Sequence, residues 1–84
     1  MDNNEKLAAA FSEALNIPAA DVVDSLAYQS IPQWDSVGHM VLISFLEQYF
    51  EISIDTQDVV DLSSVARGKE ILGKYGISFG TAVR

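Results

Sequence analysis

The residues best suited to chemistry in this sequence are Asp35 and Ser36, which stand where a long irregular segment meets a predicted helix. A serine at a helix N-terminus exposes its hydroxyl beside free backbone N–H groups, and the helix dipole favours an added negative charge there. This environment suits a serine whose oxygen becomes linked to phosphate. Asp35 can help to hold a divalent cation during such a transfer. The ordinary alternative is structural, because Asp-Ser is a common capping pair.

A hydrolase built on Ser36 and His39 is excluded on geometric grounds. The imidazole of such a site must bridge the nucleophile and a carboxylate. Asp35 is adjacent to Ser36 and should point away from any contact between Ser36 and His39. The chain has one histidine and no recognisable oxyanion loop. We therefore expect no catalytic activity, and we interpret His39 as a residue at the rim of the core.

The helix that must position Ser36 is predicted over residues 36–50, with Asp35 as its N-cap. At 100° per residue, five apolar side chains gather on the side expected to face the core: Leu42, Phe45, Leu46, Tyr49 and Phe50. Val37, Met40 and Val41 form a second apolar patch beside Ser36. A surface helix needs only one apolar stripe to pack. The second patch therefore lies under the long loop or faces a partner, and for Val37 and Met40 we favour the partner.

A first helix and a long connection precede this element. The first helix is indicated by five residues with the spacing of one helical face: Leu7, Ala10, Phe11, Ala14 and Leu15. Pro18 ends this helix or follows it closely. The connection from Ile17 to Trp34 is long for a compact domain. We expect its apolar residues to anchor it across the helices, with Trp34 covering the edge of the core and a short helical turn near 20–26.

Two helices are predicted after residue 50. Asp55 and Asp58 can cap a short third helix reaching Asp61, in a reciprocal arrangement like the capping box. Its buried side would consist of Val59, Val60 and Leu62. These three aspartates recur at every third position, whereas a calcium loop needs acids at alternate positions. We therefore interpret them as caps and a solvated acidic face.

A fourth helix is predicted to begin after Ser63 or Ser64 and to stop at Gly76. Its inward side would hold Val65, Ala66, Leu72 and Tyr75. Ile77 and Phe79 can pack back onto the helices. We predict one all-α domain over residues 1–84, with a helical core of roughly 3–76 and a tail over 77–84. The fold is expected to be a small four-helix bundle with three main helices, a short third helix and a long first loop.

Charge and composition restrict the partners. The chain has 12 acidic and 5 basic side chains, for a net charge of −7, and no lysine or arginine lies between Leu7 and Ala66. Such a surface repels nucleic-acid phosphates and anionic lipids and attracts basic protein surfaces. The absence of cysteine excludes disulfides and thiolate metal sites. We expect a cytoplasmic monomer that neither binds nucleic acid nor inserts into membranes.

The run from Asp35 to Met40, preceded by Pro32 and Trp34 and followed by the apolar helix, resembles the acyl carrier protein family with its peptidyl and aminoacyl carrier relatives. The resemblance extends over nearly the whole chain, in length, acidity, loop, serine and short third helix. It implies that Ser36 receives a 4′-phosphopantetheine arm from coenzyme A, with Asp35 assisting the transfer. The thiol of the arm would carry an acyl or aminoacyl group as a thioester, and the lack of cysteine fits a sulfur supplied by the cofactor.

The resemblance also implies a set of partner enzymes. These are a phosphopantetheinyl transferase, a ligase or synthase that loads the acyl or aminoacyl group, and downstream acyl-processing enzymes. They are expected to dock on Val37, Met40, Val41, Glu47 and Asp58. The alternative is a small acidic helical adaptor that binds a basic partner without a prosthetic group, in which Ser36 is an ordinary cap or a phosphorylation site.

The sequence departs from the family pattern at the main helix. Carriers of fatty acid synthesis usually have several carboxylates along this helix, whereas here the next acid after Asp35 is Glu47. We infer a specialised carrier loaded by a dedicated enzyme. Gly38 costs the helix about 1 kcal/mol relative to alanine. It either permits close approach of a partner or of the arm, or is simply tolerated in the first turn.

Overall fold

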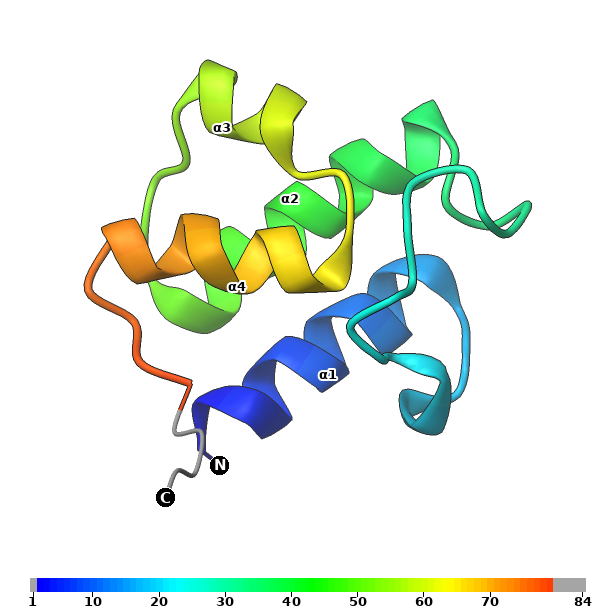
Figure 1. Cartoon of the computed structure of the whole chain (residues 1–84), viewed down its shortest axis with the longest axis horizontal. Coiled ribbons are helices and arrows are strands. Elements are labelled where there is room, and N and C mark those ends of the chain that lie inside the picture. Colours follow the sequence, from blue (N-terminus) through cyan, green and yellow to red (C-terminus); the bar gives the residue numbers. More distant parts are fainter. Residues whose placement is uncertain (1, 80–84) are drawn as a thin grey trace.

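The computed structural model describes residues 2–79, and this part of the chain is all-helical without an extended strand (Figure 1). The elements are α1 (Asn3–Leu15), the 3₁₀ turn η1 (Ala19–Asp21), α2 (Ser36–Phe50), α3 (Thr56–Asp61) and α4 (Val65–Lys74). The predicted class, with a short third helix and a long first loop, is confirmed. Of the predicted tail, residues 80–84 lie outside the described part.

The ends of α1 follow from local side-chain chemistry. Asp2 accepts a hydrogen bond from the Glu5 backbone N–H, and the Glu5 carboxylate accepts one from the Asp2 N–H, which is a complete capping box. The helix stops at Asn16, which adopts the left-handed conformation. Side chains of Asn3 and Asn4 donate to the carbonyls of Ser78 and Phe79, so the segment after α4 returns to the start of α1.

The core lies between α1, α2 and α4, and Trp34 of the first loop is part of it. The Trp34 side chain is completely buried and packs edge-to-face against Phe11, with ring centroids 5.4 Å apart. Leu42 and Leu46 of α2 are also completely buried, as predicted. Ile43 is buried too, although it was not expected in the core. Trp34 therefore does more than cover the core edge, because it is a fully buried member of the core.

The loop itself is held by backbone hydrogen bonds to the junction between α3 and α4. Leu26 accepts from the Val65 N–H, and the Tyr28 N–H donates to the Ser63 carbonyl, both at 2.9 Å. An isolated antiparallel bridge joins Ala27 to Ser64 between these bonds. These contacts satisfy backbone groups that a partly buried loop would otherwise leave unpaired. The helical turn expected near 20–26 is limited to η1.

The predictions for α3 and α4 need correction. Asp55 is the N-cap residue of α3 but makes no side-chain capping bond. Val60 is 71% exposed, whereas Leu62 is buried. Ala66 is also exposed, although Val65 and Leu72 are buried as expected. A helix of six residues has only one narrow inner face, so neighbouring valines cannot both turn inward.

Asp58 occupies the inner position of α3. Its carboxylate is 7% exposed and accepts hydrogen bonds from Lys74 Nζ at 2.5 Å and from the Tyr75 hydroxyl at 2.7 Å. The Tyr75 oxygen in turn accepts from the Asp55 N–H. The hydrogen bond from Lys74 and then that from Tyr75 hold the pKa of Asp58 below its ordinary value. Asp58 thus ties α3 to the end of α4 instead of capping α3.

We predict that this contact makes stability depend on pH in the acid range. A carboxyl with a depressed folded-state pKa stabilises the fold above its unfolded pKa of about 4, and this contribution disappears as pH falls through the lower folded-state value. Asp58→Asn should therefore lower the urea midpoint at pH 7, and its deficit against the parent should shrink below about pH 4. Asp61→Asn, on the same helix but more exposed, serves as the control. A deficit of equal size at pH 7 and pH 3 would contradict the prediction.

Candidate functional site

Ser36 is the first residue of α2, and its side chain is exposed. The N-cap residue Asp35 accepts a hydrogen bond from the Gly38 N–H at 2.8 Å through one carboxylate oxygen, while the residue remains exposed. The structure therefore places both predicted residues at the helix start and accessible from outside. Asp35 caps the helix, and its carboxylate is nevertheless exposed at the surface.

Gly38 is required by the path of the chain's own loop. A Cβ atom at this position would lie 2.3 Å from the Gln33 carbonyl oxygen and 3.2 Å from the Leu15 side chain. The first distance is far below van der Waals contact, and the obstructing atom belongs to the backbone. Neither a partner nor a prosthetic arm is needed to explain this glycine. It lets the loop pass close to α2 one residue before Trp34.

Trp34, His39 and Val59 are linked by hydrogen bonds across three segments. The Trp34 indole N–H donates to His39 Nδ1 at 3.0 Å. An indole N–H can only donate, so Nδ1 is the acceptor and the proton of the neutral ring is on Nε2. His39 Nε2 lies 2.7 Å from the Val59 carbonyl oxygen and donates to it. His39 therefore connects the loop, α2 and α3, a role that its position in the sequence does not reveal.

Tyr28, which sequence reasoning did not single out, lies directly beside Ser36. Its hydroxyl oxygen is 3.1 Å from Ser36 Oγ, within hydrogen-bond distance. Its ring meets the rings of Trp34 and His39 edge-on, with centroids 6.4 Å and 5.4 Å away. The two residues are eight positions apart, across an irregular loop, so no helical or strand spacing could have indicated the contact.

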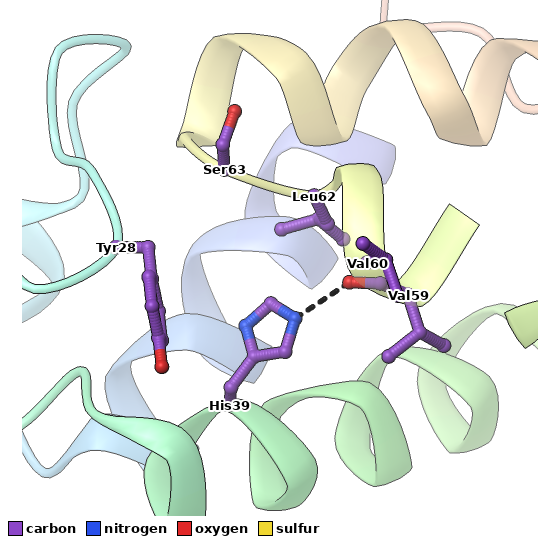
Figure 2. Close-up of a pocket in the computed structure, with 6 residues that line it drawn as sticks. All are labelled: Tyr28, His39, Val59, Val60, Leu62 and Ser63. Atoms are coloured by element: carbon purple, nitrogen blue, oxygen red, sulfur yellow. Dashed lines mark hydrogen bonds between the residues drawn. The ribbon is translucent and has the colours of Figure 1, made fainter. Parts of the chain in front are cut away.

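The Tyr28 ring forms part of the wall of a pocket of about 240 Å³. Figure 2 shows His39 between Tyr28 and Val59, with the His39–Val59 hydrogen bond drawn and with Leu62 and Ser63 above. The remaining lining comes from Val60, Leu62 and Ser63, so most of the wall is apolar. The Tyr28 side chain belongs to both features, because its ring lines the pocket and its hydroxyl contacts Ser36.

The second apolar patch of α2 is exposed. Val37, Met40 and Val41 have 73%, 62% and 39% of their surface accessible, so the long loop does not cover them. The other two predicted docking residues are placed differently. Glu47 is half-buried and accepts a hydrogen bond from the Ile54 N–H, which holds the turn after α2. Asp58 is buried against Lys74, so its carboxylate is not a free surface charge and that expectation is corrected.

Within residues 2–79, every lysine and arginine contacts an acid or an aromatic ring. The contacts are Lys6 over the Phe50 ring, Arg67 with Glu70, Lys69 with Asp24, and Lys74 with Asp58. The exposed acids outnumber these pairs, so the solvent-facing charge is negative. The same residues contain no cluster of three or more potential metal ligands, and none of their helices could cross a membrane.

Comparison with protein-family models, curated proteins and solved structures yields no match. A functional interpretation therefore depends on the chemistry of the site and on the motif around Ser36. The site combines an exposed serine at a helix start, a tyrosine hydroxyl beside it and an exposed apolar patch one turn further along α2.

We predict opposite effects for alanine at two helical glycines. Gly38→Ala should lower the free energy of unfolding by about 1–3 kcal/mol, because the added methyl group must displace the loop carbonyl. Gly73→Ala is the matched control, since nothing lies within 4 Å of its added Cβ. It should raise stability by up to about 1 kcal/mol through helix propensity. Denaturant unfolding followed by Trp34 fluorescence measures both, and two stabilised variants would disprove the close approach.

Proposed function

We propose that this chain is a small carrier protein in which Ser36 is esterified to 4′-phosphopantetheine and presents an acyl or aminoacyl thioester to partner enzymes. The observation that carries the proposal is the exposed Ser36 hydroxyl in the first turn of α2, within the Asp-Ser motif. The residues present fit the group. The hydroxyl is accessible, the helix start favours a phosphate charge, and the Tyr28 hydroxyl lies beside it.

Attachment of the arm would proceed by attack of Ser36 Oγ on the phosphorus of coenzyme A that bears pantetheine. The new Oγ–P bond replaces the pyrophosphate P–O bond, adenosine bisphosphate leaves, and the serine proton passes to a base of the transferase. Asp35 contributes an exposed carboxylate next to the reacting oxygen, where it can share a divalent cation with the transferase. Once attached, the group supplies the thiol that this cysteine-free chain lacks.

The rigid surroundings of Ser36 support a presenting role. Trp34 is locked in the core and Gly38 is held against the loop backbone, so the residues on both sides of Asp35 and Ser36 are positioned by packing. A serine held in this way presents the same geometry to several enzymes in turn. Preorganisation of this kind reduces the ordering cost of each encounter.

The exposed patch of α2 supports partner docking. Val37 and Met40 lie within the first two turns, on the helix that begins with Ser36, and most of their surface is accessible. Because the surrounding charge is negative, the complementary partner surface combines apolar side chains with basic residues at the rim. The scarcity of acids along α2 favours a specialised carrier over one of primary fatty acid synthesis. The loading enzyme would determine whether the cargo is a fatty acyl, polyketide or aminoacyl group.

The same exposed patch also favours the second candidate, an acidic helical adaptor without a prosthetic group. In that function Val37, Met40 and Val41 alone would form the binding surface. Ser36 would then be an ordinary first-turn residue beside the Asp35 cap. The two candidates differ in whether the Ser36 oxygen becomes a phosphate ester.

We predict that incubation with coenzyme A, magnesium and a broad-specificity phosphopantetheinyl transferase adds the mass of one arm to the intact protein. Ser36→Ala should abolish the addition while leaving the helical circular dichroism unchanged, because Ser36 is exposed and its removal creates no cavity. Intact-protein mass spectrometry measures the outcome. An unmodified parent that is demonstrably folded would refute the carrier and favour the adaptor.

We further predict that the start of α2 governs the rate of transfer. Asp35→Asn keeps an oxygen acceptor for the Gly38 N–H but removes the charge, and it should lower kcat/KM for arm transfer by about tenfold. Met40→Gln keeps helix propensity and size while making the patch polar, and it should lower kcat/KM by about threefold or more through a weaker encounter. Val23→Gln is the control, since Val23 is 50% exposed on the first loop. If Asp35→Asn and Met40→Gln both transfer the arm as fast as the parent and the Val23→Gln control, docking on this surface is excluded.

A further inference from the structure

The Tyr28 hydroxyl is held against Ser36 by contacts on every part of the residue. Its backbone N–H is bonded to the Ser63 carbonyl, and its neighbour Ala27 forms a bridge to Ser64 at the start of α4. Its ring is fixed edge-on against the buried Trp34 and the hydrogen-bonded His39. The 3.1 Å approach of the two oxygens is therefore set by the packed loop.

Esterification of Ser36 would change which partner can donate in this pair. In the unmodified protein either hydroxyl can be the donor. A serine whose Oγ is bonded to phosphorus has no proton, so Tyr28 becomes the only possible donor. The phenol then faces an ester that carries a negative charge, and a hydrogen bond to an ionised acceptor is stronger than one between neutral groups.

Among residues 2–79, no lysine or arginine contacts Ser36 or Tyr28. Each lysine and arginine among residues 2–79 is engaged elsewhere, on α1 or on α4. Asp35, the nearest charged residue along the chain, has the same sign as a phosphodiester. Beside Ser36 lie the backbone N–H groups of the first turn of α2 and the Tyr28 hydroxyl.

We propose that Tyr28 is a positioning residue for the modified serine: its hydroxyl orients Ser36 Oγ before transfer and donates to the phosphodiester afterwards. This inference rests on the proposed function and adds a residue that the Asp-Ser motif does not contain. Tyr28 would act through Ser36 and the attached phosphate, and the proton removed from Ser36 during transfer still goes to a base of the transferase. The Tyr28 ring also lines the pocket, so the same residue contacts both the pocket and the attachment point.

The test compares Tyr28→Phe with the parent after transfer of the arm. Phenylalanine keeps the ring between Trp34 and His39 and removes only the hydroxyl. We expect a displaced phosphorus NMR resonance of the attached phosphodiester, and a drop of about threefold to tenfold in kcat for transfer with little change in KM, because the docking patch is intact. Tyr49→Phe is the matched control: it removes the hydroxyl that donates to Glu13 near the far end of α2. It should leave the phosphorus resonance and kcat unchanged.

A rescue variant separates donation from packing. Para-aminophenylalanine at position 28 restores a donor at the ring end and should move the phosphorus resonance and kcat back toward the parent values. A phosphorus resonance and kcat in Tyr28→Phe equal to those of the parent would overturn the inference while leaving the carrier function intact. An unchanged Trp34 indole N–H resonance would show that the packing around position 28 is intact. If the para-aminophenylalanine variant keeps this resonance but does not recover the parent values, the inference is overturned as well. A parent protein that accepts no arm would overturn both the inference and the proposed function.

Discussion

Burial of Trp34 is the interaction on which the rest of this structure depends. The indole lies in the core against Phe11, and its N–H is satisfied by His39, which is bonded in turn to Val59. Trp34 is the largest of the fully buried side chains, and an aromatic ring of this size buries more apolar area than any aliphatic residue of the core. Because Trp34 immediately precedes Asp35, its position also determines where α2 begins and where Ser36 is exposed.

The loop before Trp34 is ordered by the same contact and by close backbone approaches. Gly38 admits the Gln33 carbonyl, and the segment around Tyr28 pairs with the junction of α3 and α4. A long connection is costly to order, since each fixed residue loses conformational freedom. Here the burial of Ile17, Leu26 and Trp34 and several backbone hydrogen bonds act against that loss. The result is a loop that works as a rigid part of the fold and brings a tyrosine hydroxyl to the helix start.

Charge and apolar surface are separated in a way that suits recognition. The basic residues among 2–79 are used in internal contacts, including the buried Asp58 pair that fastens α3 to α4. The outward field is therefore negative, while Val37 and Met40 remain exposed beside Ser36. The proposed docking of a basic partner would use both features, because an exposed apolar patch supplies contact area and net negative charge supplies electrostatic steering. The fold thus leaves the apolar side chains at one end of α2 exposed and uses the remaining apolar face of the helix for the core.

The sequence by itself determined the features that depend on neighbouring residues. Helical periodicity, the Asp35 cap and the Gly76 stop act within one or two turns, so the four helices, the all-α class and the exposed position of Ser36 could be predicted. Only the tertiary structure decided the contacts across the loop. The hydroxyl pair of Tyr28 and Ser36 and the burial of Asp58 join residues 8 to 17 positions apart. Such pairs depend on the path of an irregular loop and on which polar group finds a buried partner, and local spacing encodes neither.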